Sequence, residues 1–264
     1  MESYFKGAEI AGKEKTDNLL GSISISIADV YSIMGNHNNA VYYYKKAIAI
    51  HKKNDNPQEL STALNNLGDE YLLVSKPDSA LLMFEQSGPV FKRLGFTEGI
   101  AMTIGNTGIA YALKGQDELA KDEINHAINM FEKMEKYYPI TIFLTYMSDL
   151  YLNQGDWDAA FGYAKNSLEL AEKYGLKDEI SKANLQLSKL YEESGDAEAS
   201  LRHFKDHISY KDSVNNISAV QQMANIRTDF EISQKQLEVD LLNQQKRNQR
   251  IVVIVTILAL ILII

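Results

Sequence analysis

A tyrosine recurs every 40 residues through most of this chain. The tyrosines at this spacing are Tyr31, Tyr71, Tyr111, Tyr151 and Tyr191. Three residues before each tyrosine, and nine residues after it, every unit carries a small side chain. A period of this length indicates a solenoid, in which similar supersecondary units stack on one another. No other feature of the sequence constrains the fold as strongly.

Each unit has the pattern of two helices joined by a tight turn. In the second unit, Leu64, Leu67 and Tyr71 follow the three- and four-residue spacing of one helix face. Pro77 then stands where a second helix would begin, a position at which proline is tolerated. Most units carry a glycine four residues after the tyrosine, which suits the left-handed residue that ends a helix. The sequence therefore predicts an all-α fold of about five helical hairpins.

These signals also divide the chain into segments. Residues 1–19 match only the second helix of a further repeat, so we expect the array to extend before the visible start. Residues 212–250 contain neither glycine nor proline and predict one long linker helix, and an apolar run follows at residues 251–264. The five hairpins are expected at residues 20–56, 57–96, 97–136, 137–176 and 177–211.

The repeating unit resembles the tetratricopeptide repeat (TPR). In residues 61–94 the resemblance rests on Leu-Gly before the tyrosine and on an aromatic residue, Phe84, four positions after Ala80. A second good match is residues 141–174, which contain the sequence Gly-Asp-x-x-x-Ala. The period of 40 residues exceeds the 34 of a standard repeat and implies helices of about four to five turns. The resemblance implies an α-solenoid that binds a peptide or protein segment in its concave groove.

The groove candidates follow from the TPR geometry, in which the first helix of each hairpin lines the concave side. Asn side chains carry both a donor and an acceptor and suit the main chain of an extended peptide. The acids Asp29, Asp69 and Asp149 recur at one repeat position, which favours a neutral to basic partner. The alternative is that these polar residues are merely solvated. The candidates are Ser26, Asp29, Asn65, Asn66, Asp69, Asn106, Ile109, Tyr146 and Asp149.

The sequence contains little that points to catalysis or to metal binding. It has no cysteine, and Lys182 is the one basic residue expected at a groove position, so we expect no clamp for a terminal carboxylate. His203 and His207 lie four residues apart, but the glutamate that a zincin helix needs is missing, and we favour structural packing. The net charge of −8 argues against nucleic acid. We expect no enzyme activity, cofactor or metal in this stretch.

The linker at residues 212–250 carries a sparse apolar stripe with roughly heptad spacing. Two interpretations remain open, a coiled-coil seam that joins two copies of the chain and a helix that caps the last repeat. The stripe consists of Met223, Ile226, Phe230, Leu237 and Leu241.

Residues 251–264 contain a single polar side chain, that of Thr256. As a helix this run would span about 21 Å, less than the roughly 30 Å of a bilayer core. Since the run is still apolar where the sequence stops, we interpret it as the start of a transmembrane helix in a truncated sequence. The alternative is a C-terminal helix buried in a partner or an oligomer.

The order of repeats, polar helix and membrane segment resembles the TPR-containing membrane sensors of bacteria such as the Bacteroidetes. There a histidine kinase commonly follows the membrane helix. The resemblance implies a sensory input module of a single-pass inner-membrane protein with periplasmic repeats, whereas Lys246, Arg247 and Arg250 before the apolar run would favour cytoplasmic repeats. The alternative function is a membrane-anchored adaptor that assembles proteins and transmits no signal.

Overall fold

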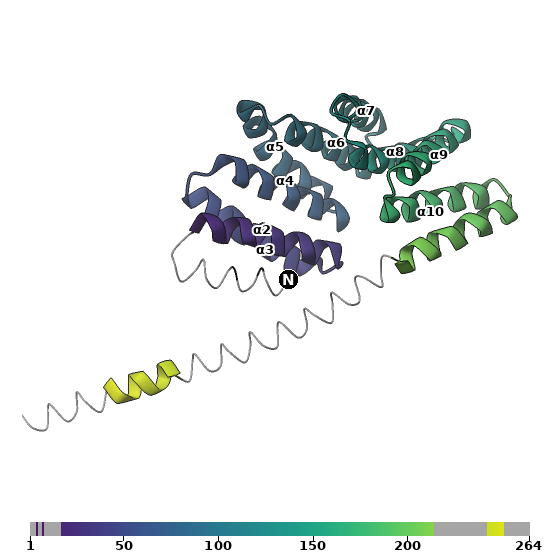
Figure 1. Cartoon of the computed structure of the whole chain (residues 1–264). Coiled ribbons are helices and arrows are strands. Elements are labelled where there is room, and N and C mark those ends of the chain that lie inside the picture. The colour runs from purple at the N-terminus through teal and green to yellow at the C-terminus, as the bar shows by residue number, and fades with distance from the viewer. Residues whose placement is uncertain (1–3, 5–6, 8–16, 214–241, 251–264) are drawn as a thin grey trace, which may run out of the picture. The chain divides into compact units, whose positions relative to one another are not determined.

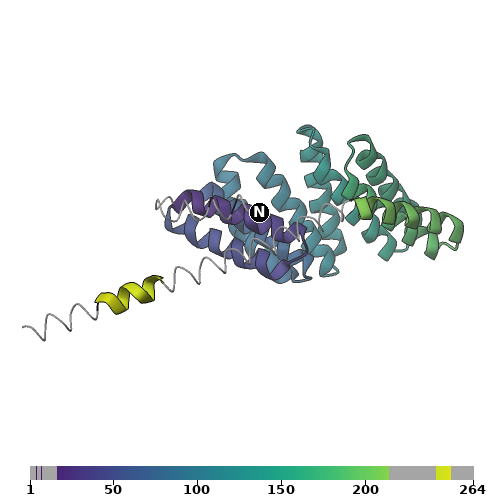
Figure 2. The same ribbon diagram turned by 60° about the horizontal axis from the view of Figure 1, so that its bottom comes forward.

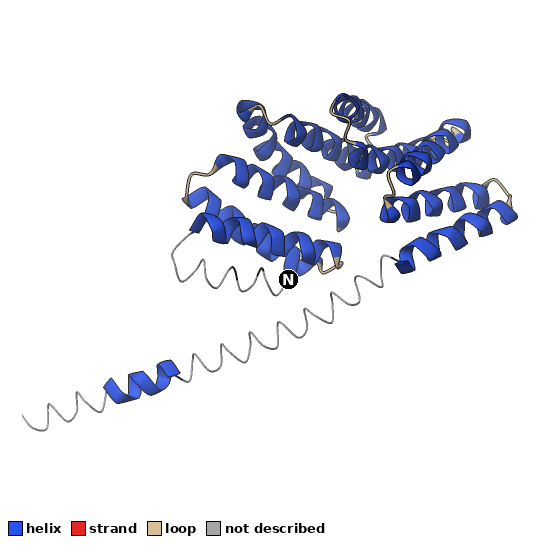
Figure 3. Cartoon of the chain, in the orientation of Figure 1, coloured by secondary structure: helices blue, strands red, loops and turns tan. Residues whose placement is uncertain are grey.

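The computed structural model describes residues 4, 7, 17–213 and 242–250. The described residues fall into two units, a stack of helices at 17–213 and a separate helix at 242–250. No strand occurs in these residues, which confirms the all-α prediction (Figure 3). Residues 197–213 are also helical. The helices of the stack that precede them are α2 (Asp17–Ile33), α3 (His37–Lys53), α4 (Pro57–Leu73), α5 (Pro77–Leu94), α6 (Thr97–Leu113), α7 (Asp117–Lys133), α8 (Tyr137–Asn153), α9 (Trp157–Lys173) and α10 (Lys177–Glu193).

The stack starts slightly earlier than the sequence suggests. Residues 17–19 of the expected segment 1–19 belong to α2 in the described structure. Tyr4 and Gly7 are helical too, and a Cβ atom placed on Gly7 would lie 3.2 Å from Cδ1 of Ile23 in α2. The rest of the expected segment 1–19 that precedes Asp17 lies outside the described residues.

Every turn of the stack ends its preceding helix in the same way. One residue in each turn has a positive φ angle, and the N–H of the following residue donates to a carbonyl five positions back, as from Asn36 to Tyr31 at 2.8 Å. This is the pattern of a Schellman cap. The 40-residue period therefore consists of two half-units of 20 residues with the same ending. The positive-φ residues are Gly35, Asp55, Ser75, Gly95, Gly115, Glu135, Gly155, Gly175 and Gly195.

Side-chain caps start several of the helices. The side chain of Asn56 accepts a hydrogen bond from the N–H of Glu59 at the start of α4, where Pro57 takes the first position. Asp156 caps α9 in the same way through the N–H of Ala159. These residues are caps that the sequence pattern predicts.

Small residues bring the two helices of a hairpin together. A Cβ atom on Gly108 would lie 2.7 Å from Cγ1 of Ile124 and 3.0 Å from the carbonyl oxygen of Ala120. Ser148 takes the same position one repeat later, and its Oγ donates to the carbonyl of Ala160 at 2.9 Å. The positions that the sequence marks as small thus lie where paired helices approach each other closely.

The two helices of a hairpin have different neighbours. The first helices contact one another across consecutive repeats, as in the pairs α2–α4, α4–α6, α6–α8 and α8–α10. The second helices α3, α5, α7 and α9 pack mainly against the first helices on either side. As a result, residues 17–213 follow an arc in which the first helices form the inner layer (Figures 1 and 2).

The predicted C-terminal segments are only partly described. Residues 242–250 form a helix whose side chains are all exposed. Residues 214–241, which carry the whole of the expected linker stripe, and residues 251–264, the expected membrane segment, lie outside the described part. Among the described helices, none combines the length and the apolar character needed to cross a bilayer.

Candidate binding groove

A groove of about 830 Å³ opens on the inner side of the arc. All five first helices, α2, α4, α6, α8 and α10, contribute side chains to it, and α3 adds His37 and Tyr44 at one end. The first helices thus line this surface, in agreement with the geometry used to choose the candidates.

Most of the candidates lie together in this groove. Asn65 does not, because its side chain is buried and its Oδ1 accepts a hydrogen bond from Oγ1 of Thr103 on α6 at 2.9 Å. Ser26 does not line it either, and its Oγ donates back to the carbonyl of Ser22. These two positions are corrections to the predicted surface. The seven residues that line the groove are Asp29, Asn66, Asp69, Asn106, Ile109, Tyr146 and Asp149.

Two of the seven residues form the floor of the groove. Ile109 is 3% exposed and belongs to the hydrophobic core, so a ligand could contact only a small part of its side chain. Asn106 is also 3% exposed, and its Nδ2 has no hydrogen-bond partner among the described residues. A buried donor without a partner lowers the free energy of unfolding by about 1–3 kcal/mol.

At the N-terminal end, Asp29 is held by two neighbours. The hydroxyl of Tyr44 donates to Oδ1 of Asp29 at 2.6 Å, and Nδ2 of Asn66 donates to the same atom at 3.2 Å. Burial raises the pKa of Asp29, and the two hydrogen bonds oppose that rise. Burial and the charge of Asp29 raise the pKa of Tyr44, so the tyrosine remains a donor at neutral pH.

Beside them lies a contact between a histidine and a glutamate that sequence reasoning missed. Nδ1 of His37 lies 2.6 Å from Oε1 of Glu70, whose side chain is 1% exposed. Glu70 directly follows the candidate Asp69 but is not among the candidates chosen from the sequence. The signal available was the position of His37 at the start of α3, the second helix of the preceding repeat.

Asp69 differs from the other acids of the groove in having no partner. Its side chain is exposed into the groove, and no hydrogen bond or ion pair joins it to the described residues. The surrounding walls displace water from its carboxyl group, and the adjacent Glu70 repels a second negative charge. Together these effects raise the pKa of Asp69 to about 6, against the opposing charge of Lys182.

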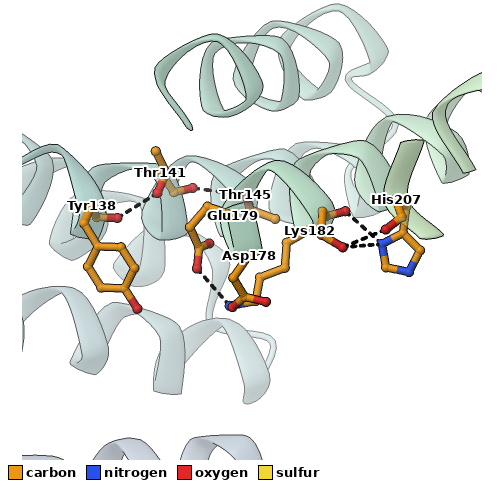
Figure 4. A network of polar contacts seen from close by, with 8 residues as sticks. Tyr138, Thr141, Thr145, Asp178, Glu179, Lys182 and His207 are labelled. Carbon is orange, nitrogen blue, oxygen red and sulfur yellow. Dashed lines mark hydrogen bonds and ion pairs between the residues drawn. The ribbon is translucent and has the colours of Figure 1, made fainter. Parts of the chain in front are cut away.

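At the C-terminal end, Lys182 is already engaged by its own helix. Its Nζ lies 2.7 Å from Oδ2 of Asp178 and 2.9 Å from Oε1 of Glu179, as Figure 4 shows. Burial raises the pKa of Glu179, and Lys182 opposes this. Lys189 also lines the groove and was missed, since only Lys182 was expected there.

Asp149 completes the row of recurring acids. Burial raises its pKa, while the charge of Lys189 and a hydrogen bond from Gln186 lower it. Six acidic residues and two lysines line the groove as a whole. The groove is therefore acidic, and its acidic character comes from more residues than the three that recur in the sequence.

The two candidate metal histidines are held by the neighbouring helix. Nδ1 of His203 lies 2.8 Å from Oδ1 of Asn184, and Nδ1 of His207 lies 3.0 Å from Oγ of Ser181. Both contacts join residues 197–213 to α10. Within the described residues, no group of three or more potential metal ligands comes together.

Comparison with protein families identifies the repeat. The family model described as tetratricopeptide repeat matches residues 19–93. The described fold is a TPR-type solenoid. A search of curated protein sequences finds no match.

Solved structures with the same fold extend the likeness over most of the chain. The crystal structure of BtubC from P. vanneervenii superposes with a TM-score of 0.61 at 17% identity, covering 81% of this chain and 90% of that one. The apo form of RapI gives a TM-score of 0.57 at 15% identity, with 79% and 69% covered. A Rap protein complexed with competence and sporulation factor gives 0.58 at 13% identity, with 81% and 75% covered. Solenoids of stacked repeats present extended concave surfaces.

Proposed function

We propose that this chain is the peptide- or protein-binding input module of a single-pass membrane signalling protein. The observation that carries the binding role is the acidic groove itself, to which five consecutive first helices contribute. It offers both main-chain recognition through Asn66 and Asn106 and apolar contact through residues such as Tyr146. No described residue suggests a chemical reaction there.

Two further observations support a bound segment. The groove follows the inner layer across five helices, so an extended chain can contact several repeats at once. One similar solenoid, the Rap protein, was solved as a complex with competence and sporulation factor. By analogy, we infer that the occupant here is a segment of another protein or a peptide.

The signalling part of the proposal rests on the sequence. The apolar run at residues 251–264 follows a basic cluster and resembles the start of a membrane helix. We propose that this segment anchors the repeats to the bacterial inner membrane, with the repeats on the periplasmic side. We further propose that a histidine kinase beyond Ile264 receives the signal through residues 212–250.

The binding role can be tested with a random library of nine-residue peptides displayed on phage. The full 264-residue chain serves as bait in detergent, and the affinity of synthesised enriched peptides is measured by fluorescence anisotropy. Asn106→Ala should weaken binding about tenfold, the value of one hydrogen bond, without lowering the melting temperature. Asn125→Ala, an exposed asparagine on α7, is the matched control and should bind normally. Failure to enrich any peptide, or equal binding by both variants, would contradict a groove-binding module.

The membrane role needs a separate experiment. The full chain and a version ending at Arg250 are produced in bacteria, and their membranes are washed with alkaline carbonate. We expect the full chain to stay in the pellet and the shorter one to be released. A periplasmic alkaline phosphatase fused to the N-terminus should be active if the repeats are periplasmic. Release of the full chain would leave the membrane anchor unsupported, and an inactive fusion would reverse the orientation.

A further inference from the structure

Only some of the charged groups in the groove have bonding partners within it. Four of its acids have partners within the groove, namely Asp29 with Tyr44, Glu70 with His37, and both Asp178 and Glu179 with Lys182. Asp149 feels the nearby charge of Lys189. Asp69 has no hydrogen bond and no ion pair within the described groove.

Asp69 also lies where the inner helices face one another. Tyr146 of α8 and Lys182 of α10 line the same groove as Asp69, which belongs to α4. Lys182 is held by Asp178 and Glu179 and does not reach the carboxyl group of Asp69. A carboxylate without a partner, in a groove that an aromatic side chain also lines, suits a cation whose carbon stem can lie against apolar surface.

A second unpaired group lines the same groove. Nδ2 of Asn106 has no partner although the residue is almost fully buried, so it needs an acceptor that the described protein does not supply. Asn106 and Asp69 lie on adjacent inner helices, α6 and α4. A buried donor and an exposed carboxylate near each other call for a ligand with both an acceptor and a cation.

An extended peptide with a lysine or arginine offers this combination. Its main-chain carbonyl accepts one hydrogen bond, and its basic side chain supplies the charge. We propose that the groove selects a segment of a partner protein that carries a basic side chain, with the cation at Asp69 and a main-chain carbonyl at Nδ2 of Asn106. This inference rests on the proposed binding function and specifies the chemistry of its ligand.

The chain's own basic helix is the competing occupant. Residues 242–250 carry Lys246, Arg247 and Arg250 and no acid. A synthetic peptide of these nine residues therefore belongs in the experiment as a probe of self-recognition.

The test uses the peptides enriched by the full chain and measures their affinities by fluorescence anisotropy. In each peptide, arginine is replaced by citrulline or lysine by acetyl-lysine, which removes the charge with little change in shape. We expect affinity to fall about tenfold or more, as it should with Asp69→Asn. The two changes together should cost no more than either alone, because they remove the same contact. Asp122→Asn, an exposed acid on the outer helix α7, is the control and should bind normally.

Three outcomes would overturn the inference. If the neutral peptides bind as tightly as the basic ones while Asn106→Ala still weakens them, the groove binds peptides but does not select a cation. If the losses from the peptide change and from Asp69→Asn add fully, the cation lies elsewhere. If the 242–250 peptide binds more tightly than every enriched peptide, the groove holds the chain's own basic segment instead of a partner's.

Discussion

The Oγ of Ser148 donates a 2.9 Å hydrogen bond to the carbonyl oxygen of Ala160, across the hairpin formed by α8 and α9. One repeat earlier, the same position is Gly108, and it has no room for even a methyl group. The closest approach of the two helices is therefore preserved in two ways, by a missing side chain and by a short side chain that bonds to the opposite backbone.

Gly108→Ala should destabilise the chain, although alanine is a better helix former than glycine. The added Cβ would lie 2.7 Å from Cγ1 of Ile124, and relieving that overlap should cost about 1–3 kcal/mol. Gly162→Ala on the outer helix α9 is the control, because nothing lies within 4 Å of its Cβ. The free energy of unfolding of that variant should rise by about 0.5–1 kcal/mol. Urea unfolding followed by circular dichroism measures both, and equal effects would mean that the hairpin contact is wrongly assigned.

Ser75→Gly should stabilise the turn between α4 and α5. Ser75 has a φ angle of 55°, a left-handed conformation that costs a non-glycine residue energy. Glycine relieves this cost, and we expect the free energy of unfolding to rise by about 0.5–1 kcal/mol. The reverse change in the next repeat, Gly115→Ala, should lower the free energy of unfolding by about 1 kcal/mol. The midpoints of urea unfolding give the signs, and a loss on Ser75→Gly would show that the serine side chain has another role.

Asp69→Asn should make the protein more stable at pH 7.5 while it weakens peptide binding. The pKa of Asp69 is about 6 in the fold against a reference value of 3.8, so the folded state binds the proton more tightly. Between pH 4 and pH 6 the contribution of Asp69 to stability therefore falls as pH rises. Asparagine carries no charge at any pH. The stability that the variant gains over the native protein should therefore be largest above pH 6 and should vanish near pH 4.

Thermal unfolding of both proteins from pH 4 to pH 8 measures that gain. Other titratable groups face this part of the groove in both proteins, so only the difference between the two proteins reports on Asp69. These groups are Asp29, His37, Glu70, Tyr146, Glu179 and Lys182. A difference that grows toward pH 4 would contradict the raised pKa.

Cross-linking tests whether the linker forms a dimer. The native chain has no cysteine, so each introduced one reports alone. If residues 212–250 pair two copies, cysteines on the apolar stripe should join subunits in membranes, while cysteines at Glu231 and Glu238 should react much less. Uniform reaction would contradict the coiled coil and favour the capping interpretation. The stripe positions to test are Met223, Phe230, Leu237 and Leu241.

The repeat architecture could be predicted because each of its causes is local. A left-handed glycine such as Gly155, a cap such as Asp156 and a small residue such as Ser148 act within one hairpin, and all three act as expected. These signals recur at a fixed spacing, so each unit reinforces the interpretation of the others.

The groove could be predicted only in outline. Whether an inner-helix side chain points into the groove or toward the next repeat depends on the rotation between repeats, which the sequence pattern does not encode. Asn65 turned toward Thr103 of α6 for this reason, while Asn66 remained at the groove. The pairing of Glu70 with His37 likewise joins residues of two different repeats.

The contacts between consecutive first helices have a mechanical consequence. Each repeat contacts the next through its first helix and also through its second helix, which packs on the next first helix, so both sets of contacts fix the curvature of the arc. A ligand that pushes two inner helices apart would straighten the arc at that interface. Because the repeats are joined in series, small rotations at successive interfaces add up along the stack. The distance between α2 and residues 197–213 would then change with the occupancy of the groove by a ligand.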